Sequence, residues 1–150
     1  MSASASFVKS LLAQCCLGGI CEWVVCPGAR NMALLQVLAA AEDLVKWTHF
    51  DERSAAFFAL GRIQDMGLPV AVVTTSGTAA AELLPAVVEA YYERRPLLLL
   101  TADRPADYRG SAAPQAIEQA DLFGIYAPTI DLETPDSLPE DILEDWDYAS

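Results

Sequence analysis

Residues 69–78 read Pro-Val-Ala-Val-Val-Thr-Thr-Ser-Gly-Thr, an apolar run that ends in small polar residues. The run up to the two threonines is almost continuously apolar and rich in β-branched side chains, which predicts a strand buried on both faces. The Ser76-Gly77-Thr78 triplet then predicts a turn and the start of a long helix that reaches about Tyr92. A doubly buried strand that leads directly into a helix is typical of a parallel sheet in an α/β domain.

The same alternation of short apolar strands and helices continues on both sides of this stretch. Further strands are predicted at 23–26, 46–50 and 97–101, with helices at 6–17, 31–41 and 52–66. Weaker patterns beyond the fourth strand predict a short helix at 115–123 and a strand at 128–132. We therefore expect an α/β domain whose parallel β-sheet is covered by helices on both faces, a Rossmann-like three-layer architecture.

The composition of the 150 residues, with 53% apolar and 20% charged side chains, fits one globular domain. A net charge of −12 and the lack of a basic stripe argue against nucleic-acid binding. No uncharged apolar segment is long enough to predict a membrane span, and the first residues lack the layout of a signal peptide. Eight of the 21 acidic residues lie in 131–150. We therefore separate a domain at 1–130 from an acidic tail, or the start of a linker, at 131–150.

The four cysteines do not predict a metal site. Cys15, Cys16, Cys21 and Cys26 form no Cys-x-x-Cys pair, and the sequence contains one histidine, His49. Reduced thiols packed as small apolar groups are the better interpretation, and they favour a cytoplasmic location.

Polar residues follow each of the four predicted strands, at the edge where parallel sheets bind their ligands. No glycine-rich phosphate-binding motif is present, so a nicotinamide-dinucleotide or P-loop site is not expected. The strand ends carry Pro27-Gly28-Ala29-Arg30, Asp51-Glu52-Arg53, Ser76-Gly77-Thr78 and Asp103-Arg104.

Two interpretations of Glu52 are open at this point. The acid is typical of a helix start, where the helix dipole favours negative charge. It also lies at the rim of the sheet before a helix of Ala and Phe, where burial would raise its pKa and allow proton exchange near neutral pH.

The other rim residues are open in the same way. Arg30 and Arg104 have the planar fork that grips a carboxylate, or are solvated surface side chains. The Ser76–Thr78 turn offers N–H groups to an anion or a ring nitrogen, or is simply a capped turn. Gln115 and Gln119 hydrogen-bond either a ligand or water.

Five motifs in order, spread over Gly19 to Pro128, resemble the N-terminal part of the 2-succinyl-5-enolpyruvyl-6-hydroxy-3-cyclohexene-1-carboxylate (SEPHCHC) synthase family. These are thiamine-diphosphate (ThDP) enzymes of menaquinone biosynthesis. Each motif alone is weak, and the ordered set is specific. The motifs are Cys-Pro-Gly-Ala-Arg at 26–30, His-Phe-Asp-Glu-Arg at 49–53, Thr-Ser-Gly-Thr-Ala at 75–79, Leu-Thr-Ala-Asp-Arg-Pro at 100–105 and Gln-Ala-Ile-Glu-Gln at 115–119.

The resemblance implies that the chain is the pyrimidine-binding (PYR) domain of such an enzyme. It implies that Glu52 is the catalytic acid, which hydrogen-bonds the pyrimidine. Pro27, Ser76, Gly77 and Thr78 would join Glu52 in binding the cofactor, and Arg30, Arg104 and Gln115 would bind substrate. Mg²⁺ and the diphosphate would be held by a diphosphate-binding domain of another chain or subunit, because no Gly-Asp-Gly motif occurs here.

The resemblance also implies the reaction: 2-oxoglutarate is decarboxylated, and the resulting succinyl-semialdehyde–ThDP carbanion adds to isochorismate. The complete enzyme would be a homo-oligomer, and this chain alone would be inactive. Ala29, Pro114 and Glu118 depart from residues frequent in the family. Two alternatives are a PYR subunit of a split ThDP-dependent 2-oxo acid decarboxylase and a non-catalytic α/β interaction domain.

Overall fold

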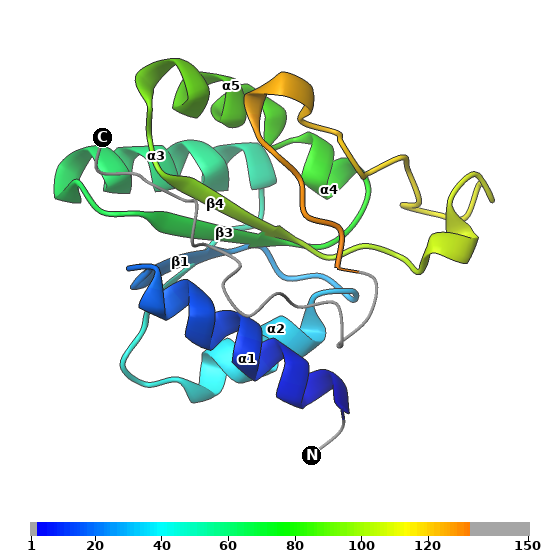
Figure 1. Cartoon of the computed structure of the whole chain (residues 1–150), viewed down its shortest axis with the longest axis horizontal. Helices are drawn as coiled ribbons and strands as arrows, with labels where there is room; N and C mark the ends of the chain where they lie inside the picture. Colours follow the sequence, from blue (N-terminus) through cyan, green and yellow to red (C-terminus); the bar gives the residue numbers. More distant parts are fainter. Residues whose placement is uncertain (1–2, 133–150) are drawn as a thin grey trace.

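Four parallel strands form one sheet in the order β2-β1-β3-β4 (Figure 1), as seen in a computed structural model that describes residues 3–132. All three strand pairs are parallel, and the observed strands agree with the predicted ones to within a residue or two at each end. The predicted α/β fold class is therefore confirmed. The strands are β1 (Glu22–Val25), β2 (Val45–Thr48), β3 (Val70–Thr74) and β4 (Leu97–Thr101).

Helices cover both faces of the sheet, and the strand order explains which helix lies where. Parallel strands are joined by right-handed crossovers. The β1-to-β2 connection crosses the sheet in one direction, and the next two connections cross it in the other. The two groups of crossover helices therefore lie on opposite faces, as Figure 1 shows. One face carries α1 (Ala3–Leu17) and α2 (Met32–Ala40), and the other carries α3 (Glu52–Met66), α4 (Thr78–Ala81) and α5 (Leu84–Glu93).

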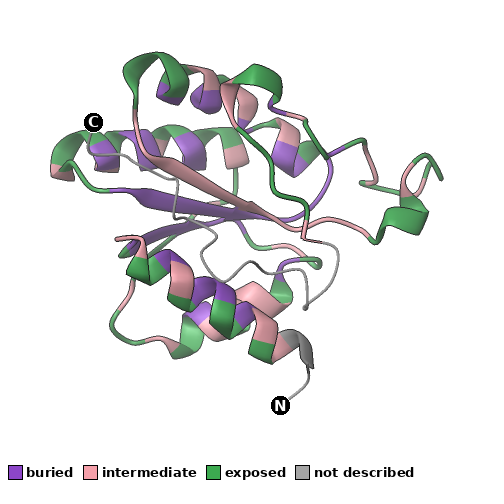
Figure 2. Ribbon diagram, viewed as in Figure 1, coloured by how far each residue is buried: buried purple, intermediate pink, exposed green. Residues whose placement is uncertain are grey.

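The two central strands are completely buried (Figure 2). Their side chains alternate between the two faces, so that Trp23 and Val73 pack under α1 and α2 while Val24 and Val72 pack under α3 and α5. Burying one such side chain contributes about 1.5–3 kcal/mol. The continuous apolar run of β3 thus reflects a strand that has a helical layer on each side.

The long helix expected to run from Ser76 to Tyr92 is in fact two helices, so that prediction was wrong. Helix α4 ends at Ala81 and α5 begins at Leu84. Pro85 lies in the first turn of α5, where its missing N–H costs nothing. In one continuous helix its ring would clash with the carbonyl of Ala81, four residues earlier.

The two weakly predicted elements after β4 are not formed. Gln115 and Asp121 have φ values of 56° and 58°, which an α-helix does not allow, and turns replace the helix expected at 115–123. Pro128 has no N–H for a strand ladder, and no strand forms at 128–132. Short 3₁₀ helices at Ala106–Tyr108 (η1) and Gly124–Tyr126 (η2) are the regular structure here. All but the first two residues of the proposed tail lie outside the described part of the chain.

An ion pair between buried Glu22 and half-buried Arg62 joins the amino-terminal end of β1 to α3. Both carboxylate oxygens of Glu22 accept hydrogen bonds from Arg62, at 2.7 and 2.9 Å, and one also accepts from the Trp47 indole at 3.0 Å. The Arg62 hydrogen bonds, followed by the one from Trp47, lower the pKa of Glu22 although burial opposes the shift. The sequence analysis did not single out this cluster.

Replacing Glu22 by Gln is expected to lower the free energy of unfolding of the chain by about 1–3 kcal/mol, the range for a lost hydrogen bond to a buried charge. Because the folded-state pKa lies below the ordinary value of 4.5, the stabilisation is complete above that pH. It declines as the pH falls through the lowered pKa. Urea unfolding at several pH values should therefore show the wild-type advantage shrink in acid.

Asp65→Asn is the matched control, because Asp65 also pairs with Arg62 but its side chain is 71% exposed. Its effect should stay within about 1 kcal/mol, as is usual for surface pairs. If the difference in free energy of unfolding between wild type and Glu22→Gln does not change with pH, the stabilising role of the ionised Glu22 carboxylate is contradicted.

Candidate functional site

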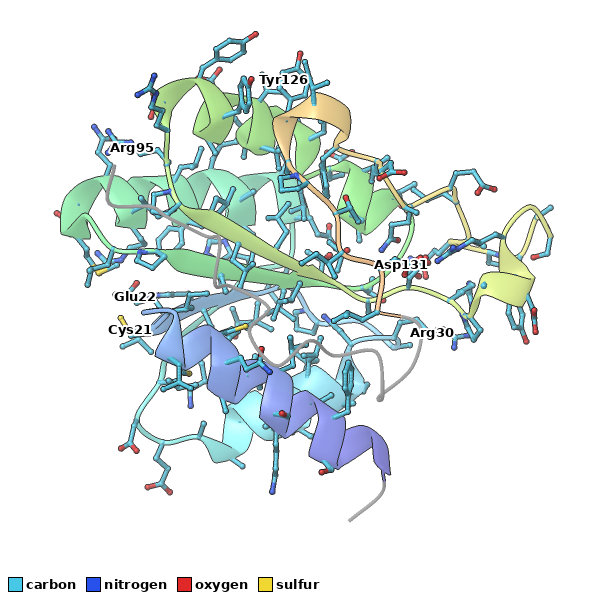
Figure 3. All side chains as sticks on the ribbon, viewed as in Figure 1. Cys21, Glu22, Arg30, Arg95, Tyr126 and Asp131 are labelled. Carbon is cyan, nitrogen blue, oxygen red and sulfur yellow. The ribbon has the colours of Figure 1, made fainter. Side chains whose placement is uncertain are left out.

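The polar residues that follow the four strands share one edge of the sheet. Since all strands are parallel, their carboxyl ends lie together, in the order set by the strands. Figure 3 shows Arg30 near this end of the sheet and Glu22 near the opposite end. The connection after β1 leads outwards to β2, and the connection after β3 leads outwards to β4, in the opposite direction. The edge between β1 and β3 is therefore the switch point where open α/β sheets bind ligands.

The loop after β1 is held by Asn31. Its side chain is fully buried; its carbonyl accepts from the Gly28 N–H at 2.9 Å, and its amide donates to the Cys26 carbonyl at 2.9 Å. Asn31 occupies the N-cap position of α2, but its side chain makes no capping hydrogen bond to the helix. It shapes instead the turn that carries Pro27 and Arg30.

The loops after β1 and β3 touch directly. A Cβ atom on Gly28 would lie 2.4 Å from the Thr75 side chain, so only glycine fits at this contact. The Thr75 hydroxyl accepts from the Arg30 N–H at 3.3 Å, while the Arg30 side chain itself is exposed. The Pro27–Arg30 turn thus packs against Thr75, directly after the end of β3.

Ser76 and Gly77 are buried and engaged within the chain. The Ser76 hydroxyl donates to the Gln115 carbonyl at 3.1 Å, and the Gly77 N–H donates to the Gln119 side chain at 2.9 Å. Gly77 has a φ of 78°, and a Cβ there would lie 2.7 Å from the Gln115 carbonyl oxygen. Thr78, which begins α4, is exposed at the rim.

Glu52 is the first residue of α3, directly after the helix cap. Asp51 is that cap, since its carboxylate accepts from the Ser54 N–H at 2.7 Å, and hydrogen bonding to Ser54 lowers the pKa of Asp51. Glu52 itself is half-buried. It lies close enough to the Cys26 thiol to help raise its pKa to about 12, although burial is the main cause. The acid therefore stands beside the end of β1, and the helix-start interpretation holds alongside the rim position.

Arg104 lies after β4 and is half-buried. Its guanidinium donates to the carbonyl of Pro114, next to Gln115. Within residues 3–132 its buried Nε atom has no hydrogen-bond partner. Arg109 pairs with Asp131 at 2.5 Å and Asp103 at 3.8 Å, which ties the end of β4 to the segment that follows η2.

Residues 7–122 match the family described as thiamine pyrophosphate enzyme, N-terminal TPP binding domain. The chain belongs to this family. It is 94% identical over all 150 residues to the 2-succinyl-5-enolpyruvyl-6-hydroxy-3-cyclohexene-1-carboxylate synthase of Akkermansia muciniphila, of which it covers 28%. It is 51% identical over 133 residues, 88% of this chain and 22% of the relative, to the protein of the same name from Geobacillus thermodenitrificans. The resemblance found in the five motifs is thereby confirmed.

The chain spans 28% and 22% of the lengths of these two relatives, about a quarter of each. A solved structure supports the fold of this TPP-binding domain. This is the thiamine diphosphate-dependent 4-hydroxybenzoylformate decarboxylase of Rhodococcus jostii RHA1. The superposition covers 84% of our chain and 23% of the decarboxylase chain, with a TM-score of 0.67 and 14% sequence identity.

The residues of this TPP-binding domain fit the pyrimidine half of a ThDP site. A half-buried carboxylic acid and exposed Pro27 and Thr78 lie at the same edge as Arg104, whose buried Nε has no partner in the described chain. Residues 3–132 contain no cluster of three or more His, Cys, Asp or Glu side chains that could hold a metal ion. Nor does any helix of residues 3–132 have the length and apolar character needed to cross a membrane.

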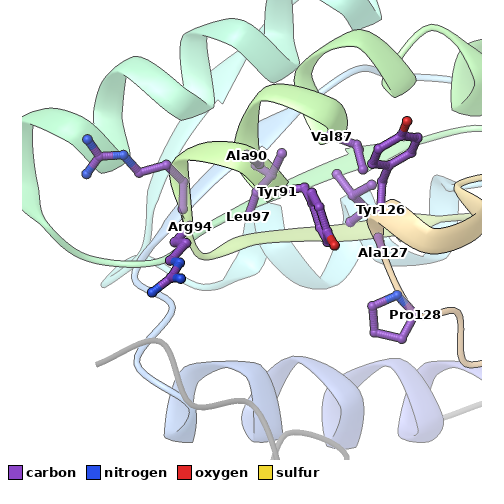
Figure 4. A pocket seen from close by; sticks show the side chains of 10 residues that line it. Val87, Ala90, Tyr91, Arg94, Leu97, Tyr126, Ala127 and Pro128 are labelled. Carbon is purple, nitrogen blue, oxygen red and sulfur yellow. The ribbon is translucent and has the colours of Figure 1, made fainter. Parts of the chain in front are cut away.

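A pocket of about 220 Å³ lies elsewhere, between α5, β4 and η2 (Figure 4). None of the predicted site residues lines it. The lining residues are Val87, Ala90, Tyr91, Arg94, Arg95, Leu97, Leu99, Tyr126, Ala127 and Pro128.

The packing of Gly77 predicts a specific sensitivity. Gly77→Ala should lower the free energy of unfolding by about 1–3 kcal/mol, because the new Cβ meets the Gln115 carbonyl and the backbone is left-handed. Gly61→Ala on α3 is the control, because nothing lies within 4 Å of its added Cβ. It should raise stability by about 0.5–1 kcal/mol. A Gly77→Ala chain as stable as wild type in urea would contradict the packing.

Proposed function

We propose that the chain is the pyrimidine-binding part of a ThDP-dependent SEPHCHC synthase. The complete enzyme would decarboxylate 2-oxoglutarate and add the four-carbon product to isochorismate, in menaquinone biosynthesis. The observation that carries the proposal is the 94% identity, over every residue of the chain, to a relative with that name. We assign residues 1–130 to the PYR domain and 131–150 to a tail or linker. A split decarboxylase subunit or an interaction domain is not favoured by this identity.

In this proposal Glu52 is the catalytic residue. When bound, ThDP would supply an acidic ring carbon, C2, as the nucleophile for the 2-oxo acid. The Glu52 carboxyl would hold a proton at N1′ of the aminopyrimidine and so favour loss of the C2 proton. The half-buried position supports this role, because partial exclusion of water strengthens a hydrogen bond to a ring nitrogen.

The other rim residues divide between cofactor and substrates. We propose that Pro27, Ser76, Gly77 and Thr78 make up the pyrimidine site. Pro27 and Thr78 are exposed and would contact the ring, while the buried Ser76 and Gly77 would shape the turn, and the tight contacts of Gly77 support a preformed loop.

Arg30, Arg104 and Gln115 are proposed to face the substrates, both of which carry carboxylates. Arginine is suited to this task by its planar fork, and the buried Nε of Arg104 would gain a partner.

The rest of the enzyme is proposed to cover this edge. Mg²⁺ and the diphosphate would be bound by a diphosphate-binding domain of another subunit in a homo-oligomer. Phe50, which precedes the helix of Glu52, is 99% exposed, and Phe57 on α3 is 43% exposed. Exposed aromatic rings next to a site are typical of a surface that a partner covers. Two exposed free cysteines, Cys16 and Cys21, support a reducing, cytoplasmic location.

The isolated chain is expected to show no synthase activity, because the magnesium and diphosphate ligands would lie in the proposed diphosphate-binding domain. Consumption of 2-oxoglutarate with isochorismate should appear only with the complete enzyme. Turnover by the purified 150-residue chain would contradict the proposal.

Glu52→Gln in the complete enzyme is expected to slow deuterium exchange at C2 of bound ThDP by about 10²–10⁴-fold. The amide has nearly the same shape as the acid but cannot exchange its proton with N1′. Quenched-flow exchange followed by proton NMR measures this rate directly.

Arg30→Ala is the comparison variant for this experiment. It should weaken substrate binding and leave the exchange rate at C2 nearly unchanged, because its side chain lies on the proposed substrate side. Exchange at the wild-type rate in Glu52→Gln would show that the catalytic acid is a different residue.

A further inference from the structure

Gln119 lies outside any helix or strand, yet its side chain is buried. It is 6% exposed and makes three hydrogen bonds to backbone and side-chain groups far away in the sequence. Its Oε1 accepts from the Gly77 N–H at 2.9 Å, and its Nε2 donates to the Ala102 carbonyl at 3.0 Å and the Thr101 hydroxyl at 3.2 Å. The amide therefore bridges the ends of β3 and β4.

The orientation of this amide is dictated by its partners. The Gly77 N–H is only a donor, and the Ala102 carbonyl is only an acceptor. A flipped amide would place hydrogen against hydrogen at Gly77 and oxygen against oxygen at Ala102. Glutamine supplies one acceptor and one donor at the right separation, which neither an aliphatic side chain nor an ionised carboxylate can do.

The same segment grips the turn after β3 a second time. Four residues before Gln119, the Gln115 carbonyl accepts from the Ser76 hydroxyl and packs against Gly77. The segment 115–119 thus holds both Ser76 and Gly77, and Gln115 is itself a proposed substrate-binding residue. A shift of the Gly77 peptide would move both sides of the site together.

We propose that Gln119 is a positioning residue that holds the Gly77 peptide, and with it the Ser76–Thr78 turn, in the conformation that receives the pyrimidine. The inference rests on the proposed function, because it assumes that this turn faces ThDP. In this proposal Gln119 does not contact the cofactor. Its side-chain oxygen accepts the hydrogen bond from the Gly77 N–H, and its side-chain nitrogen holds the turn against the end of β4.

The first test replaces Gln119 by Leu in the complete enzyme. ThDP binding, measured by fluorescence quenching at saturating Mg²⁺, should weaken by about tenfold or more, since the preformed turn is lost. The KM for isochorismate should rise as well, because Gln115 moves with the same segment. Hydrogen exchange of the apoenzyme should show faster exchange at the Gly77 amide, a readout that needs no activity.

A second variant separates positioning from folding. In Gln119→Glu, the protonated acid can accept from Gly77 and donate to Ala102, whereas the ionised form faces the Ala102 carbonyl with two acceptors. Its ThDP affinity relative to wild type should therefore recover as the pH falls from about 8 to about 6. The pH dependence of Gln119→Glu therefore tests the proposal even if Gln119→Leu does not fold.

Gln64→Leu is the matched control, since Gln64 is an exposed glutamine near the far end of α3. It should leave ThDP binding and Gly77 exchange unchanged. The inference is overturned if the Gln119 variants only lower the unfolding temperature, bind ThDP as tightly as wild type, and show no pH dependence of ThDP affinity relative to wild type. Gln119 would then stabilise the fold without positioning the turn for ThDP. If the wild-type enzyme itself does not bind ThDP, the proposed function fails and the inference fails with it.

Discussion

Complete burial of β3 between β1 and β4 is the constraint on which the rest of the molecule depends. A strand with apolar side chains on both faces needs a helical layer above and below it, and only crossover helices between parallel strands provide both. The parallel arrangement in turn brings every strand's carboxyl end to one edge. The loops that carry Arg30, Thr78 and Arg104 therefore meet there, although the sequence separates them widely.

Close backbone contacts at this edge give the candidate site its shape. Gly28 lies against Thr75 and Gly77 against Gln115, at distances that no larger residue would allow. Buried amides of Asn31 and Gln119 then satisfy the backbone groups that such tight turns leave without partners. These buried contacts hold the loops in place, which supports the proposal of a preformed half-site that a second domain completes.

The two ends of the sheet are built differently. The amino-terminal end is held by the Glu22–Arg62 ion pair, in which Arg62 donates to both carboxylate oxygens of Glu22. The carboxyl end leaves Glu52 half-buried and Phe50 fully exposed. The carboxyl end therefore combines tightly packed turns with side chains that stay accessible at the proposed site.

Local signals in the sequence missed the break between α4 and α5, but they were sufficient to find the four strands and helices α1 to α3. They placed α3 at the observed bounds, Glu52–Met66. The reason is that its cap, Asp51, and its left-handed terminator, Gly67, act within a few residues of the helix. The five ordered motifs were likewise enough to recognise the family. Two contacts became visible only in the tertiary structure: the hydrogen bond from the Gly77 N–H to Gln119, and the Glu22–Arg62 ion pair. They join residues that are 42 and 40 positions apart in the sequence. Such contacts exist because the sheet brings distant segments together, and no local pattern in the sequence encodes them.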